Sequence, residues 1–399
     1  MSRTRQRDTV GHGADTRTTT TEDSVFLHAG ELVVTSIEAT TTVANTDASR
    51  GTPASQGTPR ELRDRMLARV EERLAALLAQ ERAYWSEQNP DALELVDCVG
   101  AMVASGGKRL RPAFCIAAYL AAGGDPESEV AVDAAAALEL MHTSALLHDD
   151  VLDESELRRG GPTAHVLHAT LHRERDWHGD ARHYGQSVAM LAGNLAIVYA
   201  ERLLAHCPPA ARSVWGELST ELMVGQFLDV RAAARFQPDI PLARWIALFK
   251  SGRYTVYRPL AVGAMLAGGS PELLTPFEEY GLALGEAFQL RDDLLDAFGD
   301  TDITGKPARL DFKQHKMTLL MSFALQDEPE VKALVGDDLP NTDPEELHAL
   351  LLKTGMKDRV ESVIEERLKV ANDAVSAALP AEWAAELHAM ARAAAYREK

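Results

Sequence analysis

The sequence has 399 residues, 46% of them hydrophobic and 25% charged, a composition typical of a globular protein. Its formal net charge of −19 argues against nucleic acid or an anionic membrane surface as the main partner. Three scattered cysteines fit neither a disulfide framework nor a zinc site, and no apolar run is long enough to predict a transmembrane segment, so we expect a cytoplasmic protein.

Residues 1–58 are rich in Thr, Ser, Gly, Ala and Asp, and we predict that they form a disordered low-complexity tail. A helical pattern begins at Pro59, where Leu62 and Met66 open a series of apolar residues spaced by four and three. Similar patterns, separated by glycine and proline turn signals, continue along the chain, without an alternating strand pattern. We therefore predict an all-α fold in which residues 59–399 form one large single-domain helical bundle.

Residues 165–183 form a polar segment with five histidines. His168 and His172 are four residues apart, a spacing that places both on one helix face and could chelate a metal. No acid or cysteine completes the set at a familiar spacing. We therefore interpret this segment as a solvated helix end and loop.

The most informative feature is a repeated DDxxD sequence, each copy of which follows a long apolar helical stretch. A single copy is typical of a solvated helix end, because neighbouring carboxylates repel unless solvent or a cation compensates them. If the two helices face each other, six carboxylates line one cavity mouth, and such oxygen-rich sites suit Mg²⁺ that bridges to phosphate. The six candidates are Asp149, Asp150, Asp153, Asp292, Asp293 and Asp296.

Two basic segments accompany the aspartates. Residues 106–112, GGKRLRP, combine a glycine turn with a basic helix start, where backbone amides and cations attract phosphate. Arg158 and Arg159 follow the first DDxxD sequence on a loop, and guanidinium groups bind phosphate bidentately. These features predict a site that binds a diphosphate through metal ions and lets it leave an allylic carbon. A second alkene would then attack the carbocation in a water-poor apolar cavity.

These segments resemble the trans-isoprenyl diphosphate synthases, the polyprenyl synthetase family, and are most like geranylgeranyl diphosphate synthases. The motifs are GGKRLRP (106–112), LLHDDVLDESELRRGGPTAH (146–165), and FQLRDDLLD (288–296) followed by GKP (305–307). The resemblance implies a helical bundle around a central cavity, usually a homodimer. It also implies a prenyltransferase that condenses isopentenyl diphosphate with an allylic diphosphate, head to tail, with three Mg²⁺ ions per active site.

The resemblance also implies roles for single residues. The implied metal ligands are Asp149, Asp150, Asp153, Asp292 and Asp296, and the implied catalytic set adds Asp293, Lys250 and Lys306. The implied isopentenyl diphosphate contacts are Lys108, Arg111, His142 and Arg159. Arg158 would face the allylic diphosphate, and the further substrate contacts would be Ser251 and Gln289. Gln226 and Asp229, in GQFLD, match another helix of the family. The chain departs from the family at Ser251, usually Thr, and at Arg309 and His315, usually Gly, so we expect the loop of residues 305–316 to close differently.

Product length is predicted from the residues that precede the first DDxxD sequence. Ala145 is four residues before Asp149, one turn (about 5.4 Å) deeper along the helix, and Ser144 is beside it. In the family, aromatic residues at these two positions stop growth at short products, but both residues are small here. Met141, one turn further, would form the floor. We therefore predict a C20 product, geranylgeranyl diphosphate, with C25 or longer as the alternative.

Other functions compete with this prediction. A class I terpene cyclase also ionises diphosphates on an α-helical fold, but it typically has one DDxxD sequence and needs no GGKRxRP segment. A non-catalytic synthase subunit usually loses one aspartate motif, whereas this chain keeps both. A helical di-iron protein needs Glu and Glu-x-x-His ligands, which the aspartate doublets do not supply. A requirement for isopentenyl diphosphate, and activity of the purified protein alone, discriminate among these functions.

Overall fold

The computed structural model describes residues 57–235, 240–299, 312, 318–335 and 342–397, without the side chains of Ala233, Ile240 and Ser251. The described residues belong to one compact unit of the chain, Pro53–Lys399. The predicted tail, apart from its last two residues, lies outside the described residues, as do Lys306 and the side chain of Ser251.

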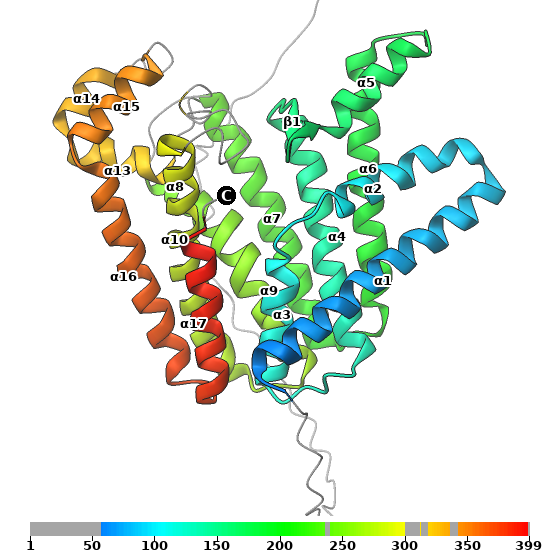
Figure 1. The fold of residues 1–399 in the computed structure, drawn as a ribbon, viewed down its shortest axis with the longest axis horizontal. Coiled ribbons are helices and arrows are strands. Elements are labelled where there is room, and N and C mark those ends of the chain that lie inside the picture. The colour runs from blue at the N-terminus through cyan, green and yellow to red at the C-terminus, as the bar shows by residue number, and fades with distance from the viewer. Residues whose placement is uncertain (1–56, 236–239, 300–311, 313–317, 336–341, 398–399) are drawn as a thin grey trace, which may run out of the picture. The chain divides into compact units, whose positions relative to one another are not determined.

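Helices make up nearly all of the described secondary structure, which confirms the all-α prediction (Figure 1). The helices of the first half are α1 (Pro59–Gln88), η1 (Pro90–Ala92), α2 (Leu93–Ala104), α3 (Leu110–Ala121), α4 (Glu129–Leu152), α5 (Ala164–Glu174), α6 (Ala181–Leu203) and η2 (Leu204–His206). The helices of the second half are α7 (Pro209–Arg235), α8 (Ile240–Ala247), η3 (Leu248–Tyr257), α9 (Arg258–Leu266), η4 (Pro271–Leu273), α10 (Leu274–Phe298), α13 (Leu319–Asp327), α14 (Pro329–Val335), α15 (Pro344–Lys353), α16 (Met356–Ser376) and α17 (Ala381–Ala395).

Helix α1 begins at Pro59, as the sequence predicts. Thr58 is its N-cap, and its hydroxyl accepts a hydrogen bond from the Glu61 amide (3.3 Å) while the Glu61 carboxylate accepts one from the Thr58 amide (2.8 Å). This reciprocal capping box satisfies two backbone donors that the helix leaves unpaired. The apolar face predicted from Leu62 and Met66 is buried in the core, so the spacing identified the packed side of the helix.

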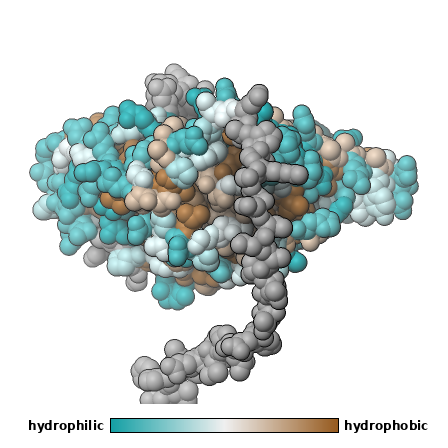
Figure 2. All heavy atoms as spheres, turned by 90° about the horizontal axis from the view of Figure 1, so that it is seen from below, coloured by the Kyte–Doolittle hydropathy of each residue, from teal (hydrophilic) through white to brown (hydrophobic). Residues whose placement is uncertain are grey.

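Helix α4 is largely buried and packs against α1, α3 and α6. By length and composition alone, α4 and the stretch Ala181–His206 are the two described helices that could cross a membrane, but 72% of the α4 window is buried inside the fold, as in a core helix. Seen from below, hydrophobic side chains gather toward the middle of the surface and hydrophilic ones toward its edges (Figure 2).

Helix α7 and the π-helix η3 both contact the end of α4, because Gln226 of α7 and Lys250 of η3 hydrogen-bond to Asp149. They pack against each other, and η3 also packs along α10. Gly252 of η3 meets Gly285 of α10 so closely that a Cβ added to Gly285 would lie 2.0 Å from Gly252 Cα, an approach that requires glycine. In the view of Figure 1, α7 lies between α4 and α10. The C-terminal ends of α4 and α10, which carry the two DDxxD sequences, are therefore positioned by a shared set of helices.

A small hairpin follows α4. Its strands β1 (Leu157–Arg158) and β2 (Gly161–Pro162) pair antiparallel, and the two loop residues, Arg159 and Gly160, have φ values of 52° and 79°. Positive φ at both central residues is typical of two-residue hairpin turns. These strands were not predicted from the sequence, because two residues per strand are too few to give an alternating pattern.

Candidate active site

The first aspartate sequence lies at the C-terminal end of α4, where Asp149 and Asp150 occupy the last turn and Asp153 is the C-cap. Asp150 is only 1% exposed, and its Oδ1 accepts hydrogen bonds from Nε (2.7 Å) and Nη2 (2.6 Å) of Arg158, which the hairpin holds beside it. Burial raises the pKa of Asp150, although Arg158 opposes that shift. Its Oδ2 is buried and has no hydrogen-bond partner among the described residues. A buried carboxylate oxygen in this state favours a cation nearby.

Asp149 is held by two other helices. Gln226 Nε2 of α7 donates to Asp149 Oδ1 (3.0 Å), and Lys250 Nζ of η3 lies 3.2 Å from the same oxygen. Lys250 Nζ is also 2.7 Å from Asp229 Oδ2 of α7. Burial disfavours the charged ammonium group, but the two aspartates outweigh burial and hold the pKa of Lys250 above its ordinary range. The structure thus brings together Asp149, Lys250 and the GQFLD residues, and Lys250 occupies a π-helix, an irregularity frequently found at functional sites.

The second aspartate sequence lies in the last turns of α10. Asp293 is buried, and its two carboxylate oxygens accept hydrogen bonds from Gln289 Nε2 (2.9 Å) and from the Leu320 amide at the start of α13 (3.0 Å). Asp293 and Gln289 therefore anchor α13 in this structure. The predicted metal ligands do not include Asp293. Its catalytic role and the substrate contact of Gln289 both stay predictions.

Asp292 forms an ion pair with Arg397, a residue that the sequence analysis did not single out. The Arg397 guanidinium also lies 3.6 Å from the centroid of the Phe288 ring, in a cation–π contact. Arg397 follows α17, far from Asp292 in the sequence, so no local pattern could have indicated this pair. Each of the two aspartate sequences therefore has at least one carboxylate that forms an ion pair with a basic side chain.

The predicted isopentenyl diphosphate residues lie around the start of α3 and the middle of α4. Arg111 Nη2 donates to Thr255 Oγ1 (2.8 Å), and its guanidinium lies 4.2 Å from the centroid of the Tyr254 ring. Burial, followed by the positive charges of Arg111 and Arg159, lowers the pKa of His142 well below its ordinary value. Arg111 and Arg159 thus both lie close enough to His142 to act on it. Lys108, three residues before Arg111 in the chain, is exposed.

The predicted chain-length residues lie on α4, before the first aspartate sequence. Met141 and Ser144 are buried, and Ala145 is half-buried. Ser144 Oγ is buried without a hydrogen-bond partner among the described residues. Leu138, one turn before Met141, is fully buried. Along this part of α4 the side chains are therefore small next to the aspartates, at Ser144 and Ala145, and larger further back along the helix, at Met141 and Leu138.

The histidine-rich segment differs from the expectation. His165 and His172 of α5 are buried, and the His172 ring contacts the rings of Trp177 and Tyr184, with centroid distances of 6.1 and 5.3 Å. The prediction of a solvated segment is wrong for these two histidines, which are seven residues apart and share the packed face of a helix. The i, i+4 pair gives no metal site in the part of the chain that the structure describes.

The donors at the two helix ends are carboxylate oxygens, which suit Mg²⁺. Among the described residues, no group of three or more His, Cys, Asp or Glu side chains is arranged to hold a metal by itself. Mg²⁺ is usually held by one or two carboxylates together with water and substrate phosphates, so no protein-only cage is needed. Together with the unpartnered Asp150 Oδ2, this donor set fits Mg²⁺ that binds with a diphosphate.

Comparison with known proteins gives a consistent set of matches. The model of the polyprenyl synthetase family matches residues 93–351. A short chain isoprenyl diphosphate synthase of Methanothermobacter thermautotrophicus is 32% identical over 231 residues, 56% of this chain and 65% of that relative, so the chain spans just under two thirds of it. A geranylfarnesyl diphosphate synthase of Aeropyrum pernix is 29% identical over 286 residues, 69% of this chain and 85% of that relative.

A solved structure of a geranylgeranyl pyrophosphate synthase from Corynebacterium glutamicum, complexed with isoprenyl diphosphate and magnesium, superposes on this chain with a TM-score of 0.75 and 35% sequence identity. The match covers 85% of this chain and 98% of that one. The similarity therefore includes nearly all of that enzyme and leaves out part of this chain.

Proposed function

The chain belongs to the polyprenyl synthetase family of trans-prenyltransferases, as its motifs predicted, and on that premise we propose that it condenses isopentenyl diphosphate with an allylic diphosphate. The observation that carries the proposal is the interleaving of acids and cations at the end of α4. Asp149 and Asp150 contact Lys250 and Arg158 there, and Asp150 Oδ2 has no partner among the described residues. Groups of both signs are what a metal-bound diphosphate needs, because the acids hold the metal and the cations contact phosphate oxygens.

The residues of this site have distinct roles in the proposed reaction. Asp149, Asp150 and Asp153 on α4, with Asp292 and Asp296 on α10, would hold Mg²⁺, three ions in the full complex. Bound Mg²⁺ supplies Lewis-acid neutralisation of the diphosphate charge. With the charges of Asp149 and Asp150 compensated by Mg²⁺, Arg158 and Lys250 would turn from these aspartates toward the leaving diphosphate and stabilise the negative charge that develops on it. Lys306 would add a further cation from outside the described residues.

The second substrate would bind beside the first. Lys108, Arg111 and Arg159 supply the positive charge for isopentenyl diphosphate, and His142 lies next to them. Because the pKa of His142 is lowered, its ring is neutral at pH 7 and offers a hydrogen bond without adding charge. Ser251 and Gln289 would complete the substrate contacts. This arrangement would place the alkene of one substrate against the allylic carbon of the other, which removes most of the entropic barrier.

We propose a C20 product for this chain. The small side chains of Ser144 and Ala145 leave room beside the first aspartate sequence, and the buried Met141 would limit growth one turn deeper. A product of C25 or longer is the alternative, because relatives of this family bear names that differ in product. The geranylfarnesyl diphosphate synthase described above is named for a C25 product, whereas a farnesyl diphosphate synthase from Mycobacterium bovis, 34% identical over 224 residues, is named for a C15 product.

We further propose a cytoplasmic homodimer. Leu191 and Val198 of α6 are 55% and 52% exposed and lie seven residues apart, on one side of the helix. A second copy of the chain would bury them. One relative is named as component 2 of a heptaprenyl diphosphate synthase of Geobacillus stearothermophilus, so a heteromeric assembly is the alternative. Sedimentation of the wild type and of Leu191→Glu tests this proposal. A wild-type dimer that becomes a monomer in the variant supports it, and a wild type that is already a monomer contradicts it.

The test of the proposed reaction is incubation of the purified protein with Mg²⁺, isopentenyl diphosphate and each allylic starter, followed by mass spectrometry of the products. We expect incorporation of isopentenyl units and a main product of C20. Hydrocarbon formed without isopentenyl diphosphate would indicate a terpene cyclase instead. Complete inactivity, restored by a partner chain, would indicate a non-catalytic subunit.

A further inference from the structure

The loop that joins α2 to α3 has an unusual backbone. Gly106 and Gly107 have φ values of 90° and 150°, and Arg109, which carries a Cβ, has a φ of 48°. A left-handed conformation is unfavourable for such a residue and persists only where surrounding contacts hold it. Arg109 is also the N-cap of α3, yet its side chain makes no cap hydrogen bond. Its side chain is committed elsewhere.

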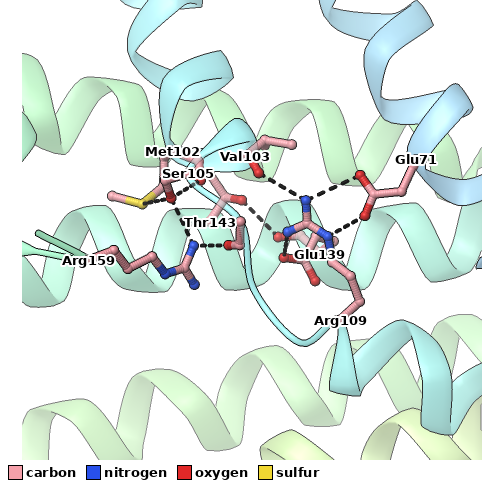
Figure 3. A network of polar contacts seen from close by, with 9 residues as sticks. Glu71, Met102, Val103, Ser105, Arg109, Glu139, Thr143 and Arg159 are labelled. Carbon is pink, nitrogen blue, oxygen red and sulfur yellow. Dashed lines mark hydrogen bonds and ion pairs between the residues drawn. The ribbon is translucent and has the colours of Figure 1, made fainter. Parts of the chain in front are cut away.

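The Arg109 guanidinium is bound by three groups from other helices (Figure 3). Nη1 donates to Glu139 Oε1 of α4 (2.6 Å), and Nη2 donates to Glu71 Oε2 of α1 (3.2 Å) and to the carbonyl oxygen of Val103 at α2 (2.9 Å). Nε also donates to Glu71. Burial opposes the charge of Arg109, but Glu71 and Glu139 outweigh it and raise the pKa of the guanidinium.

This pairing makes Arg109 unsuited to binding a substrate. Glu139 is only 4% exposed, so moving the guanidinium toward a phosphate would leave a buried carboxylate without its cation. The contacts instead fix the loop from one side. Arg159 fixes it from the other side, because its Nη1 donates to Ser105 Oγ (2.8 Å) and to the Gly106 carbonyl oxygen (Figure 3). A Cβ at Gly107 would lie 3.2 Å from Arg159 Nη2 and 3.7 Å from Arg109 Nη1.

We propose that Arg109, clamped by Glu71 and Glu139, is a positioning residue that holds Lys108 and Arg111 in place for isopentenyl diphosphate. This inference rests on the proposed function of the site. Lys108 directly precedes Arg109, and Arg111 lies two residues beyond it in the first turn of α3, so both inherit the backbone that the clamp fixes. Glu71 lies on α1, before residues 93–351 that match the family, so this contact connects α1 to the site.

The test compares two carboxylate–arginine pairs, each of which includes a residue of α1. Glu71→Gln removes half of the clamp at a side chain that is 49% exposed, so the fold tolerates the change better than at the buried Glu139. The matched control is Asp133→Asn, because Asp133 of α4 pairs with Arg73 Nε of α1 (2.6 Å) and does not touch the loop. If the unclamped loop is correctly placed about a tenth of the time, the KM for isopentenyl diphosphate rises about tenfold in Glu71→Gln. The kcat and the KM for the allylic substrate stay unchanged, and all three parameters stay unchanged in Asp133→Asn. Glu71→Asp, which retains the charge, restores part of the loss.

The possible outcomes separate the two proposals. A wild-type enzyme that consumes no isopentenyl diphosphate overturns the proposed function and the inference together. An active wild type with a Glu71→Gln variant of unchanged KM overturns the inference alone. The inference is also overturned if Glu71→Gln and Asp133→Asn lower kcat and raise both KM values to the same extent. That result would indicate only that α1 packs less well against the rest of the bundle.

Discussion

Lys250 of η3 lies 3.2 Å from Asp149 of α4, and this contact connects two helices that are far apart in the sequence. The π-helix that carries Lys250 packs along α10, where Gly252 meets Gly285. The end of α4 and the helix of the second aspartate sequence are therefore attached to the same π-helix. In this structure Lys250 provides the positive charge that Asp149 requires, and Mg²⁺ bound together with the diphosphate would take over that role.

We expect Lys250→Met to lower kcat strongly. The variant removes a cation aimed at the developing charge of the leaving diphosphate, and loss of one such group costs about a hundredfold in kcat. Steady-state kinetics with both substrates and saturating Mg²⁺ measure the effect. The control is Lys353→Met, because Lys353 pairs with Glu330 on the surface, 2.7 Å away, and should leave kcat unchanged. Equal kcat values for the two variants would remove Lys250 from the proposed mechanism.

Ala145→Phe is expected to shorten the product from C20 to C15. The ring would fill the space about one turn (roughly 5.4 Å) from Asp149, where the growing chain must pass. Mass spectrometry of the dephosphorylated products measures the shift. The control is Leu146→Phe, because the next residue on the helix points about 100° away and should leave product length unchanged. If Ala145→Phe still makes mainly C20, the chain does not grow along this face of α4.

His142 should make the stability of the protein depend on pH. Its folded-state pKa is lowered, chiefly by burial, whereas the unfolded chain has the ordinary value of about 6.5. As the pH falls below that value, the unfolded state binds a proton that the folded state rejects. The free energy of unfolding then decreases by up to about 1.4 kcal/mol per pH unit. Above pH 7.5 this contribution is fully present.

Urea unfolding between pH 7.5 and 5.5 measures this effect. The difference in unfolding free energy between these pH values should be smaller in His142→Gln than in the wild type. His206→Gln, at an exposed site, serves as the control and should follow the wild type. Parallel profiles for wild type and His142→Gln would show that the histidine keeps its ordinary pKa in the folded protein.

Local patterns in the sequence predicted much of the fold. The helical pattern that begins at Pro59 and the apolar spacing from Leu62 identified α1 and its buried face, because both depend on residues within a few turns. The β1–β2 hairpin was missed, since its strands are too short to carry a pattern. The burial of His172 was missed because its aromatic partner Trp177 lies beyond the end of the helix, where spacing gives no information.

The acidic residues of the candidate site were predictable from the sequence, whereas the contacts of its basic residues were less so. The two DDxxD sequences are local signals, and the structure places Lys250, whose role came from the family resemblance, against Asp149. The contacts of Arg109 and Arg397 were not predictable, because each pairs with acids on helices distant in the sequence. Such pairs depend on how whole helices pack, and a single sequence does not encode that packing in any local period.

We propose that the aspartates at the ends of α4 and α10 together bind one diphosphate through Mg²⁺. Calorimetry of farnesyl thiolodiphosphate, an allylic analogue that ionises too slowly to react, tests it in the wild type, Asp149→Asn, Asp292→Asn and the double variant. Asp97→Asn, at a surface pair with Arg82, is the control. We predict Mg²⁺-dependent binding that each single variant weakens strongly, with a loss in the double variant that differs from the sum of the two, because both ends act on one shared ligand. Binding that needs no Mg²⁺, or two losses that simply add, would contradict the claim.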